Sequence, residues 1–116
     1  MESFTQLEAW KIGLVLVEEI YNLTKKFPKN EQFGLTSQMR RASTSILANL
    51  AEGFSRSGSR DKAYKYTIAR GECSEIHAFL LVSKKLEFRS SEEAKYSIDL
   101  TCKVRKLLSG LINRYS

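Results

Sequence analysis

The chain has 116 residues, a formal net charge of +6 and a single proline, which favours one small, mostly helical domain over a modular protein. Hydrophobic residues make up 42% of it and charged residues 28%, a balance that supplies a core and excludes a globally disordered chain. No apolar run approaches the roughly 20 residues that cross a bilayer, and residues 1–4 lack the start of a secretory signal. We therefore expect a single domain over residues 1–116, in the cytoplasm.

The first predicted helix carries two apolar rows at the three- and four-residue spacing of a helix face. One row is Leu7, Trp10, Leu14, Val17, Tyr21 and Thr24, and the other is Gly13, Leu16, Ile20, Leu23 and Phe27. Thr5 and Glu8 have capping-box spacing at its start, and Pro28 ends it. Two rows give this helix more apolar surface than one neighbouring element can cover. We therefore expect it to pack between two or more partners.

The second helix is predicted from about Leu35 to Glu52, with one apolar row and otherwise small or polar faces. Gly53 is its expected C-terminal stop. Residues 53–59 are rich in glycine and serine, which indicates a loop and makes this segment the best candidate for a mobile one. Ser59 is placed to cap the helix that follows.

The third predicted helix is the longest, from Arg60 to about Glu87, and a fourth follows a hinge at 88–91, where Ser90 and Glu93 have capping-box spacing. Gly71 lies inside the third helix, where glycine costs roughly 1 kcal/mol relative to alanine, so we expect the second helix to approach its backbone closely. No strand pattern of similar length competes. Four helices with short connections predict an all-α fold, an antiparallel up-down-up-down four-helix bundle.

A long motif in the centre of the chain resembles a known family. It runs Phe27-Pro28-x-x-Glu31-x-Phe33-Gly34-Leu35-x-x-Gln38-x-Arg40-Arg41-Ala42-x-x-Ser45-Ile46-x-x-Asn49-x-Ala51-Glu52-Gly53 and continues through Ile68-Ala69-Arg70-Gly71-Glu72-Cys73-x-Glu75. This pattern closely resembles the bacterial ribosomal RNA intervening-sequence proteins, and residues 10–21 also fit. The resemblance covers nearly the whole chain and is weakest after Phe88. Residues 70–73 depart from the family, which more often has small or aliphatic residues there.

The resemblance implies a left-handed bundle that assembles into a ring, typically a pentamer. The resemblance implies no particular activity, because the intervening-sequence proteins have no settled biochemical function. A distantly similar bundle is the accessory protein of diversity-generating retroelements, where a basic ring engages a reverse transcriptase and nucleic acid. That precedent is an analogy of fold.

Positive charge is concentrated in the second half of the chain. Residues 59–116 hold twelve basic and seven acidic residues, net +5, whereas residues 1–58 hold seven and six, net +1. The predicted nucleic-acid-binding residues form two clusters, Arg56, Arg60, Lys62 and Lys65, continued by Arg70, and Lys103, Arg105 and Lys106, continued by Arg114. Such clusters suit the phosphate backbone of RNA or DNA. The alternative is that they are solvated helix faces that keep a small protein soluble.

Four polar residues occupy positions that periodicity places on or near packed faces: Arg41, Asn49, Glu52 and Glu75. A buried charge needs a partner. We therefore expect an internal network in which an arginine of the second helix reaches Glu75, and Asn49 bonds across to a neighbouring helix or loop. Its expected role is to fix the helix register, and the alternative is an active site built from these groups.

Few residues could bind a metal or carry catalysis. His77 is the single histidine, and neither Glu72 nor Glu75 lies three residues before it, as a di-iron motif requires. Cys73 and Cys102 form no disulfide framework or zinc site, and no nucleophile has a recognisable signature. We expect no catalytic, cofactor or metal site. The predicted function is a non-enzymatic, homo-oligomeric scaffold that binds RNA or DNA backbone and no membrane, and the alternative is a purely structural or protein-binding module.

Overall fold

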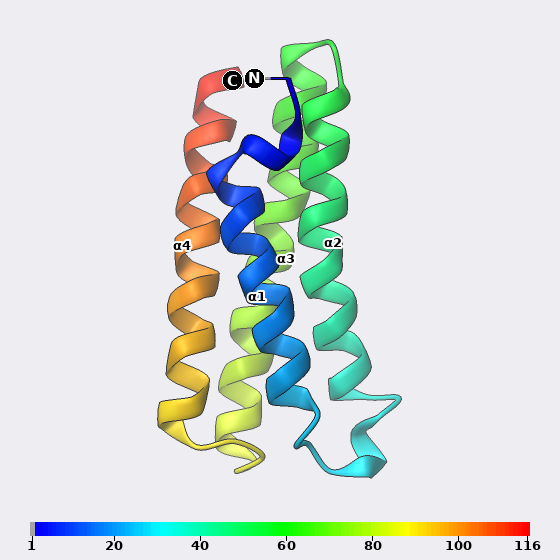
Figure 1. The fold of residues 1–116 in the computed structure, drawn as a ribbon, viewed down its shortest axis with the longest axis vertical. Coiled ribbons are helices and arrows are strands. Elements are labelled where there is room, and N and C mark those ends of the chain that lie inside the picture. Colours follow the sequence, from blue (N-terminus) through cyan, green and yellow to red (C-terminus); the bar gives the residue numbers. More distant parts are fainter. Residues whose placement is uncertain (1) are drawn as a thin grey trace.

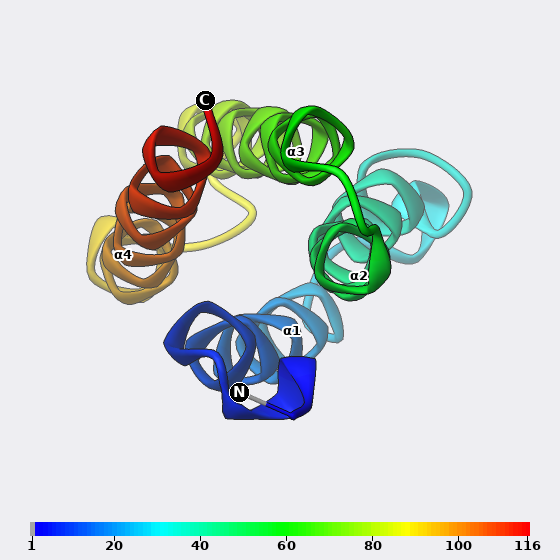
Figure 2. The same cartoon turned by 90° about the horizontal axis from the view of Figure 1, so that it is seen from above.

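The computed structural model describes residues 2–116 and has four α-helices in an antiparallel bundle (Figure 1). They are α1 (Glu8–Thr24), α2 (Leu35–Ser55), α3 (Ser59–Lys85) and α4 (Ser91–Tyr115), with short 3-10 turns at Phe4–Gln6 and Lys29–Glu31. Seen along the bundle, the helices stand at the corners of a square, so each helix packs on its sequence neighbour and α1 also packs on α4 (Figure 2). The described part measures 43 × 24 × 20 Å. The predicted all-α four-helix bundle is confirmed.

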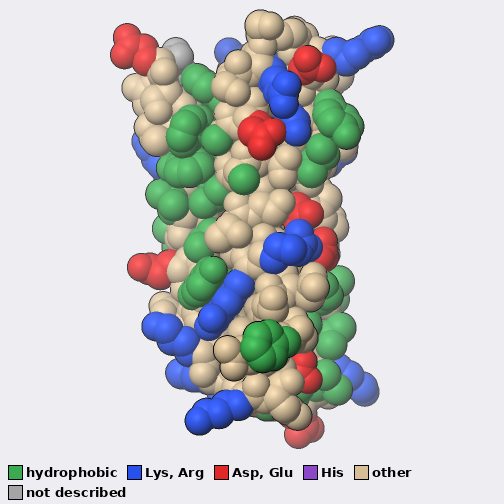
Figure 3. All heavy atoms as spheres, turned by 90° about the vertical axis from the view of Figure 1, so that its right-hand side faces the viewer, with side chains coloured by type: hydrophobic (Ala, Val, Ile, Leu, Met, Phe, Trp, Pro, Cys, Tyr) green, Lys and Arg blue, Asp and Glu red, His purple; other side chains and the backbone are tan. Residues whose placement is uncertain are grey.

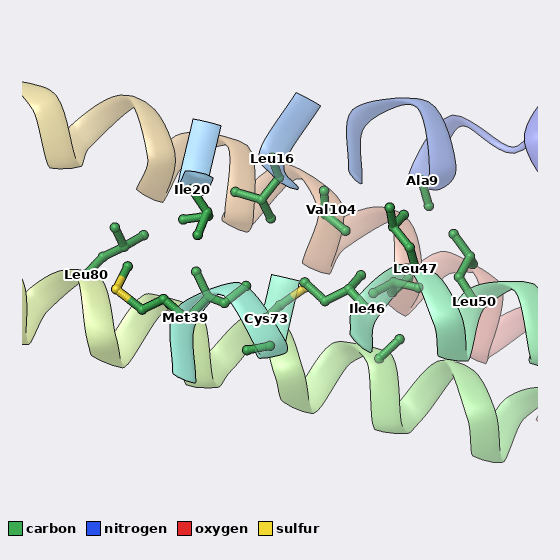
Figure 4. Close-up of a cluster of buried hydrophobic side chains, with 14 of the residues drawn as sticks. Ala9, Leu16, Ile20, Met39, Ile46, Leu47, Leu50, Cys73, Leu80 and Val104 are labelled. Carbon is green, nitrogen blue, oxygen red and sulfur yellow. The ribbon is translucent and has the colours of Figure 1, made fainter. Parts of the chain in front are cut away.

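One face of each helix builds a continuous core. Its fully buried side chains include Leu16 and Ile20 of α1, Met39, Ile46 and Leu50 of α2, Tyr66, Cys73, Ile76 and Leu80 of α3, and Val104 and Leu108 of α4. Figure 4 shows these rows meeting between the helices, with Leu16 and Val104 facing Cys73 and Ile46. In α3 the row at positions 66, 69, 73, 76 and 80 has the spacing of one helix face and is buried along its whole length.

The two apolar rows of α1 differ in burial. The row with Leu16 and Ile20 faces the core and is buried. In the other row Leu14 is 47% exposed and Tyr21 37% exposed, and the adjacent Val15 is 42% exposed. Helix α1 contacts α2 and α4, so it does lie between neighbours, but these two helices leave part of its apolar surface open.

The capping box predicted at the start of α1 is wrong. Ser3 and Gln6 form the box instead, on the 3-10 turn: Thr5 N donates to Ser3 Oγ at 3.1 Å and Ser3 N donates to Gln6 Oε1 at 3.2 Å. Helix α1 therefore begins at Glu8 with no side-chain cap. Ser3 and Gln6 have the same three-residue spacing as Thr5 and Glu8, so either pair could form a capping box. The box forms on the 3-10 turn, which precedes the helix.

The box predicted at the start of α4 is confirmed. Glu93 N donates to Ser90 Oγ and Ser90 N donates to Glu93 Oε1, both at 3.2 Å. The Ser90 backbone hydrogen bond lowers the pKa of the Glu93 carboxyl. Helix α3 ends at Lys85, two residues before its predicted end at Glu87, because Glu87 takes a left-handed backbone conformation with φ 61°.

Helix α2 continues beyond its predicted end. It extends to Ser55, and α3 begins at Ser59 after Gly58 as its N-cap, so the expected loop over residues 53–59 shrinks to three residues, 56–58. Ser59 therefore lies inside α3 and does not cap it. Gly53 is buried within α2, where a Cβ would meet the Tyr66 ring at 2.7 Å. This glycine lets α3 approach closely and does not stop the helix.

The close approach predicted at Gly71 is wrong, because no atom lies within 4 Å of the place that a Cβ would take there. We expect Gly71→Ala to raise the free energy of unfolding by about 0.5–1 kcal/mol, since alanine loses less backbone entropy in a helix and has open space here. Urea unfolding followed by circular dichroism measures this. The matched control Gly53→Ala should destabilise the protein, because the Tyr66 ring would have to move. A Gly71→Ala protein no more stable than wild type would contradict the exposed placement.

Candidate nucleic-acid interface

The first basic cluster, Arg56, Arg60, Lys62 and Lys65, lies where α2 ends and α3 begins. Lys62 Nζ donates to Phe54 O at 2.7 Å and to Gly53 O at 3.3 Å. These carbonyls belong to the last turn of α2, where carbonyl groups lack the usual intrahelical partner, although Gly53 O also accepts from Arg56 N at 3.3 Å. Lys62 also lies over the rings of Phe54 and Tyr115, at 5.5 and 5.7 Å. It is half-buried and serves as the C-terminal cap of α2.

Glu52 pairs with two other cations of this cluster. Its Oε2 lies 2.9 Å from Lys65 Nζ and 3.6 Å from Arg56 Nη2, and the hydrogen bond from Lys65 lowers the pKa of the Glu52 carboxyl. Arg60 is exposed and has no ion pair with any residue that the structure describes. Of the four cations predicted here, Arg60 alone has neither an ion pair nor a hydrogen bond within residues 2–116.

The second cluster, Lys103, Arg105 and Lys106, lies on α4. Lys103 and Lys106 are exposed, and Arg105 is half-buried in a groove of about 410 Å³ between α3 and α4. Arg70 of α3 reaches the same two helices, since its Nη1 donates to Ser109 Oγ of α4 at 3.3 Å. We call these four cations and the groove the α3–α4 seam. None of the four has an ion pair in the described part of the chain.

Three acidic side chains near the middle of the two helices bind cations outside the seam. Glu72 and Glu75 of α3 bind Arg41 of α2, and Asp99 of α4 binds Lys95 at 3.1 Å. Figure 3 shows the contrasting face over α2, where acidic side chains are interspersed among the basic ones. The antiparallel packing of α3 on α4 thus brings Arg70 to Ser109, one helical turn beyond Arg105. No carboxylate of the described residues pairs with Arg70 or with the second cluster.

The predicted contact between an arginine of α2 and Glu75 is present. Arg41 Nη2 donates to Glu75 Oε1 at 2.6 Å, and Arg41 Nη1 lies 3.4 Å from Glu72 Oε2. The hydrogen bond to Glu75 raises the pKa of the Arg41 guanidinium. The arginine side chain is 49% exposed, so this is a surface ion pair, which contributes little to stability. Sequence reasoning missed Glu72, which lies one helix position before the buried Cys73.

The single internal network predicted from Arg41, Asn49, Glu52 and Glu75 is wrong. Asn49 Nδ2 donates to Ser45 O at 2.9 Å within its own helix, and Glu52 belongs to the separate pair with Lys65. Asn49 completes its bonding locally, as a short amide on a helix often does with the carbonyl four residues earlier. Two separate groups of surface ion pairs therefore connect α2 to α3.

The thiols and the histidine assemble no site of their own. Cys73 is fully buried, and burial raises the pKa of its thiol to about 12, so the thiol stays protonated and unreactive at neutral pH. Cys102 is half-buried in the α3–α4 groove beside His77. Residues 2–116 contain no group of three or more His, Cys, Asp or Glu side chains that could hold a metal ion. None of the described helices combines the length and the apolar composition that a membrane span requires.

The fold and the seam define a small four-helix-bundle protein with a basic helix pair. Residues 5–110 match the family described as 23S rRNA-intervening sequence protein, and the chain belongs to that family. The family resemblance seen in the sequence is thereby confirmed. A similar solved structure is a protein with unknown function from the S23 ribosomal protein family of Bacteroides thetaiotaomicron VPI-5482, with 25% sequence identity, a TM-score of 0.83, and coverage of 90% of this chain and 95% of that chain. Among the curated proteins, none matches this chain.

Proposed function

We propose that the protein is a non-enzymatic scaffold that binds the phosphate backbone of RNA or DNA along the α3–α4 seam. The observation that carries this proposal is the set of four cations, Arg70, Lys103, Arg105 and Lys106, none of which is ion-paired within the described residues. The net charge of +6 supports attraction of a polyanion. The family description refers to 23S rRNA, which makes a structured RNA the first ligand to test.

Binding at the seam uses charge and not base sequence. Arg105 lies in the groove, and the exposed Lys106 and Lys103 follow it around the outer side of α4, with Lys103 about 160° from Arg105. A phosphate backbone that crosses the outer side of α4 can therefore meet all three. Phosphate contacts position a nucleic acid without specifying its sequence. If all four cations contact phosphates of a duplex, the logarithm of the binding constant falls with the logarithm of salt concentration with a slope of about −3.6.

The test compares two triple variants that change the net charge equally. The seam variant is Lys103→Glu, Arg105→Glu and Lys106→Glu, and the matched control is Lys11→Glu, Lys26→Glu and Lys85→Glu, at exposed positions outside the seam. For a fluorescent duplex RNA and its DNA counterpart, we expect the seam variant to lose about tenfold or more in affinity at moderate salt and about three units of salt slope. The control should retain the slope. Equal losses in both variants, or no binding by wild type at low salt, would refute the seam as an interface.

Self-association is a second candidate function, favoured by the open apolar surface of α1. Leu14, Val15 and Tyr21 are all exposed on this helix, with Leu14 and Tyr21 on the same side two turns apart, and exposed apolar surface of this kind commonly marks an interaction site. We propose that copies of the chain associate through this surface. Sedimentation of wild type at micromolar concentration should give an oligomer that Leu14→Glu dissociates, and a wild-type monomer would contradict this candidate.

A further inference from the structure

Phe33 is the most exposed large hydrophobic side chain of the described protein, at 91%. It lies in the connection between α1 and α2, which projects beyond the helices at the lower right of Figure 1. The backbone on either side is tied down, because Gly34 N donates to Glu31 O at 3.0 Å and Leu35 N donates to Glu31 Oε1 at 3.1 Å. The turn thus holds the ring in solvent, where it contributes almost nothing to the core.

The ring of Phe33 borders a hollow of about 370 Å³ that also includes Tyr21 of α1, Gln32 of the connection and polar side chains of α2. Among these polar groups, the Gln32 amide and the Ser37 hydroxyl make no hydrogen bond to any described residue. An aromatic wall beside free amide and hydroxyl groups suits a flat heteroaromatic ring with a polar edge. These are the features that recognise an unstacked nucleobase.

Arg40 supplies a fixed positive charge beside the hollow. Its guanidinium carbon lies 4.6 Å from the centre of the Tyr21 ring, and its Nε donates to Thr24 Oγ1 at 2.9 Å. These contacts orient the group and leave both terminal nitrogens without a hydrogen bond or ion pair in residues 2–116. Lys25 and Lys29, both exposed, line an adjoining hollow with Arg40. A phosphate next to the stacked base would therefore meet unpaired cations.

We infer that this end of the bundle is a second nucleic-acid site, in which an unpaired base of a single strand stacks on Phe33 and an adjacent phosphate binds Arg40. The inference rests on the proposed function for its ligand class and adds a preference for unpaired bases, which the seam does not provide. Bases within a duplex are already stacked on their neighbours and do not enter. The combination of a stacking ring with a positively charged groove is the general design of single-strand binding surfaces.

The test uses Phe33→Ala with three probes: a single-stranded oligonucleotide, an abasic strand with the same number of phosphates, and a duplex, each made as RNA and as DNA. We expect Phe33→Ala to weaken binding of the single strand by about fivefold to 150-fold and to leave abasic and duplex affinities unchanged. Phe33→Trp should restore binding, and its fluorescence should be quenched by the single strand and not by the duplex. Tyr64→Ala, which removes a 62% exposed ring outside the hollow, is the matched control and should have no effect.

The outcomes separate this inference from the proposed function. Unchanged single-strand affinity in Phe33→Ala, with duplex binding intact, overturns the base site alone, whereas unchanged duplex affinity in the seam variant overturns the seam alone. A wild-type protein that binds no probe refutes both. If Phe33→Ala lowers the oligomeric mass in sedimentation and leaves single-strand affinity unchanged, Phe33 contacts a second copy of the chain and the base site is wrong. The RNA and DNA versions show which sugar the site accepts.

Discussion

Leu16→Ala is expected to lower the free energy of unfolding by about 2–5 kcal/mol, whereas Leu14→Ala should change it by less than about 1 kcal/mol. Leu16 is fully buried between the helices, and Leu14 on the same helix is 47% exposed. Truncation of Leu16 removes apolar surface from the core and leaves a cavity that packed neighbours fill only partly. Truncation of Leu14 removes surface that water already reaches. Urea unfolding of the two variants, monitored by circular dichroism, gives both values.

Leu14→Ala is the matched control for Leu16→Ala, because both variants make the same chemical change in the same helix. The change in helix propensity from leucine to alanine is nearly the same at the two positions, so the difference between them reports burial. Losses of similar size in dilute protein would contradict the orientation of α1. Similar losses that appear only at high protein concentration would mean that a second copy covers Leu14, as the self-association candidate requires.

The sequence predicted the number and order of the helices because their periodicity records the core. The third helix illustrates this: the spacing of Tyr66, Cys73 and Ile76 fits one helix face, and all three are buried. For α1 the same reasoning found two apolar rows and could not rank them, since both are rich in leucine and aromatic residues. The choice depends on where α2 and α4 pack, which is a property of the whole bundle.

Glycines in helices were the least predictable feature. Gly53 was expected to end a helix and Gly71 to allow a close approach, yet a Cβ at Gly53 would meet the Tyr66 ring and one at Gly71 would meet nothing within 4 Å. The exposure of Gly71 could have been predicted from the sequence, because this residue lies two positions from both Ala69 and Cys73 of the buried row. Two residues correspond to about 200° around a helix, which puts Gly71 on the opposite, solvent-facing side.

The candidate interface was predicted in part because neighbouring cations in sequence are easy to see. Whether a cation is already paired depends on contacts across the bundle, such as Lys65 with Glu52, which no local pattern shows. Arg70 and Arg105 flank the same seam only because α3 and α4 are antiparallel. Phe33 was noticed only as part of a family motif, although an aromatic residue next to glycine between two predicted helices is itself a signal of exposure.

Lys62→Ala is expected to lower the free energy of unfolding by about 1.5–3 kcal/mol, the contribution of a hydrogen bond to a charged group. The ammonium group donates to the carbonyls of Gly53 and Phe54, and its loss leaves Phe54 O without a donor at a half-buried helix end, while Gly53 O keeps the hydrogen bond from Arg56 N. Lys65→Ala is the matched control, since it removes the same charge three residues away. Its ion pair with Glu52 lies at the surface, and such pairs contribute about 0–1 kcal/mol.

The same two variants decide whether the α2–α3 end binds nucleic acid. To contact a phosphate, Lys62 would have to leave the α2 carbonyls, so binding there would compete with the helix cap, whereas the cations of the seam have no ion pair to give up. We therefore expect Lys62→Ala to lose stability and to keep its affinity for duplex RNA within about twofold of Lys65→Ala, since each variant removes one positive charge. A stable Lys62→Ala protein with a large loss of affinity would contradict the seam and show that the nucleic acid binds at this end of the bundle.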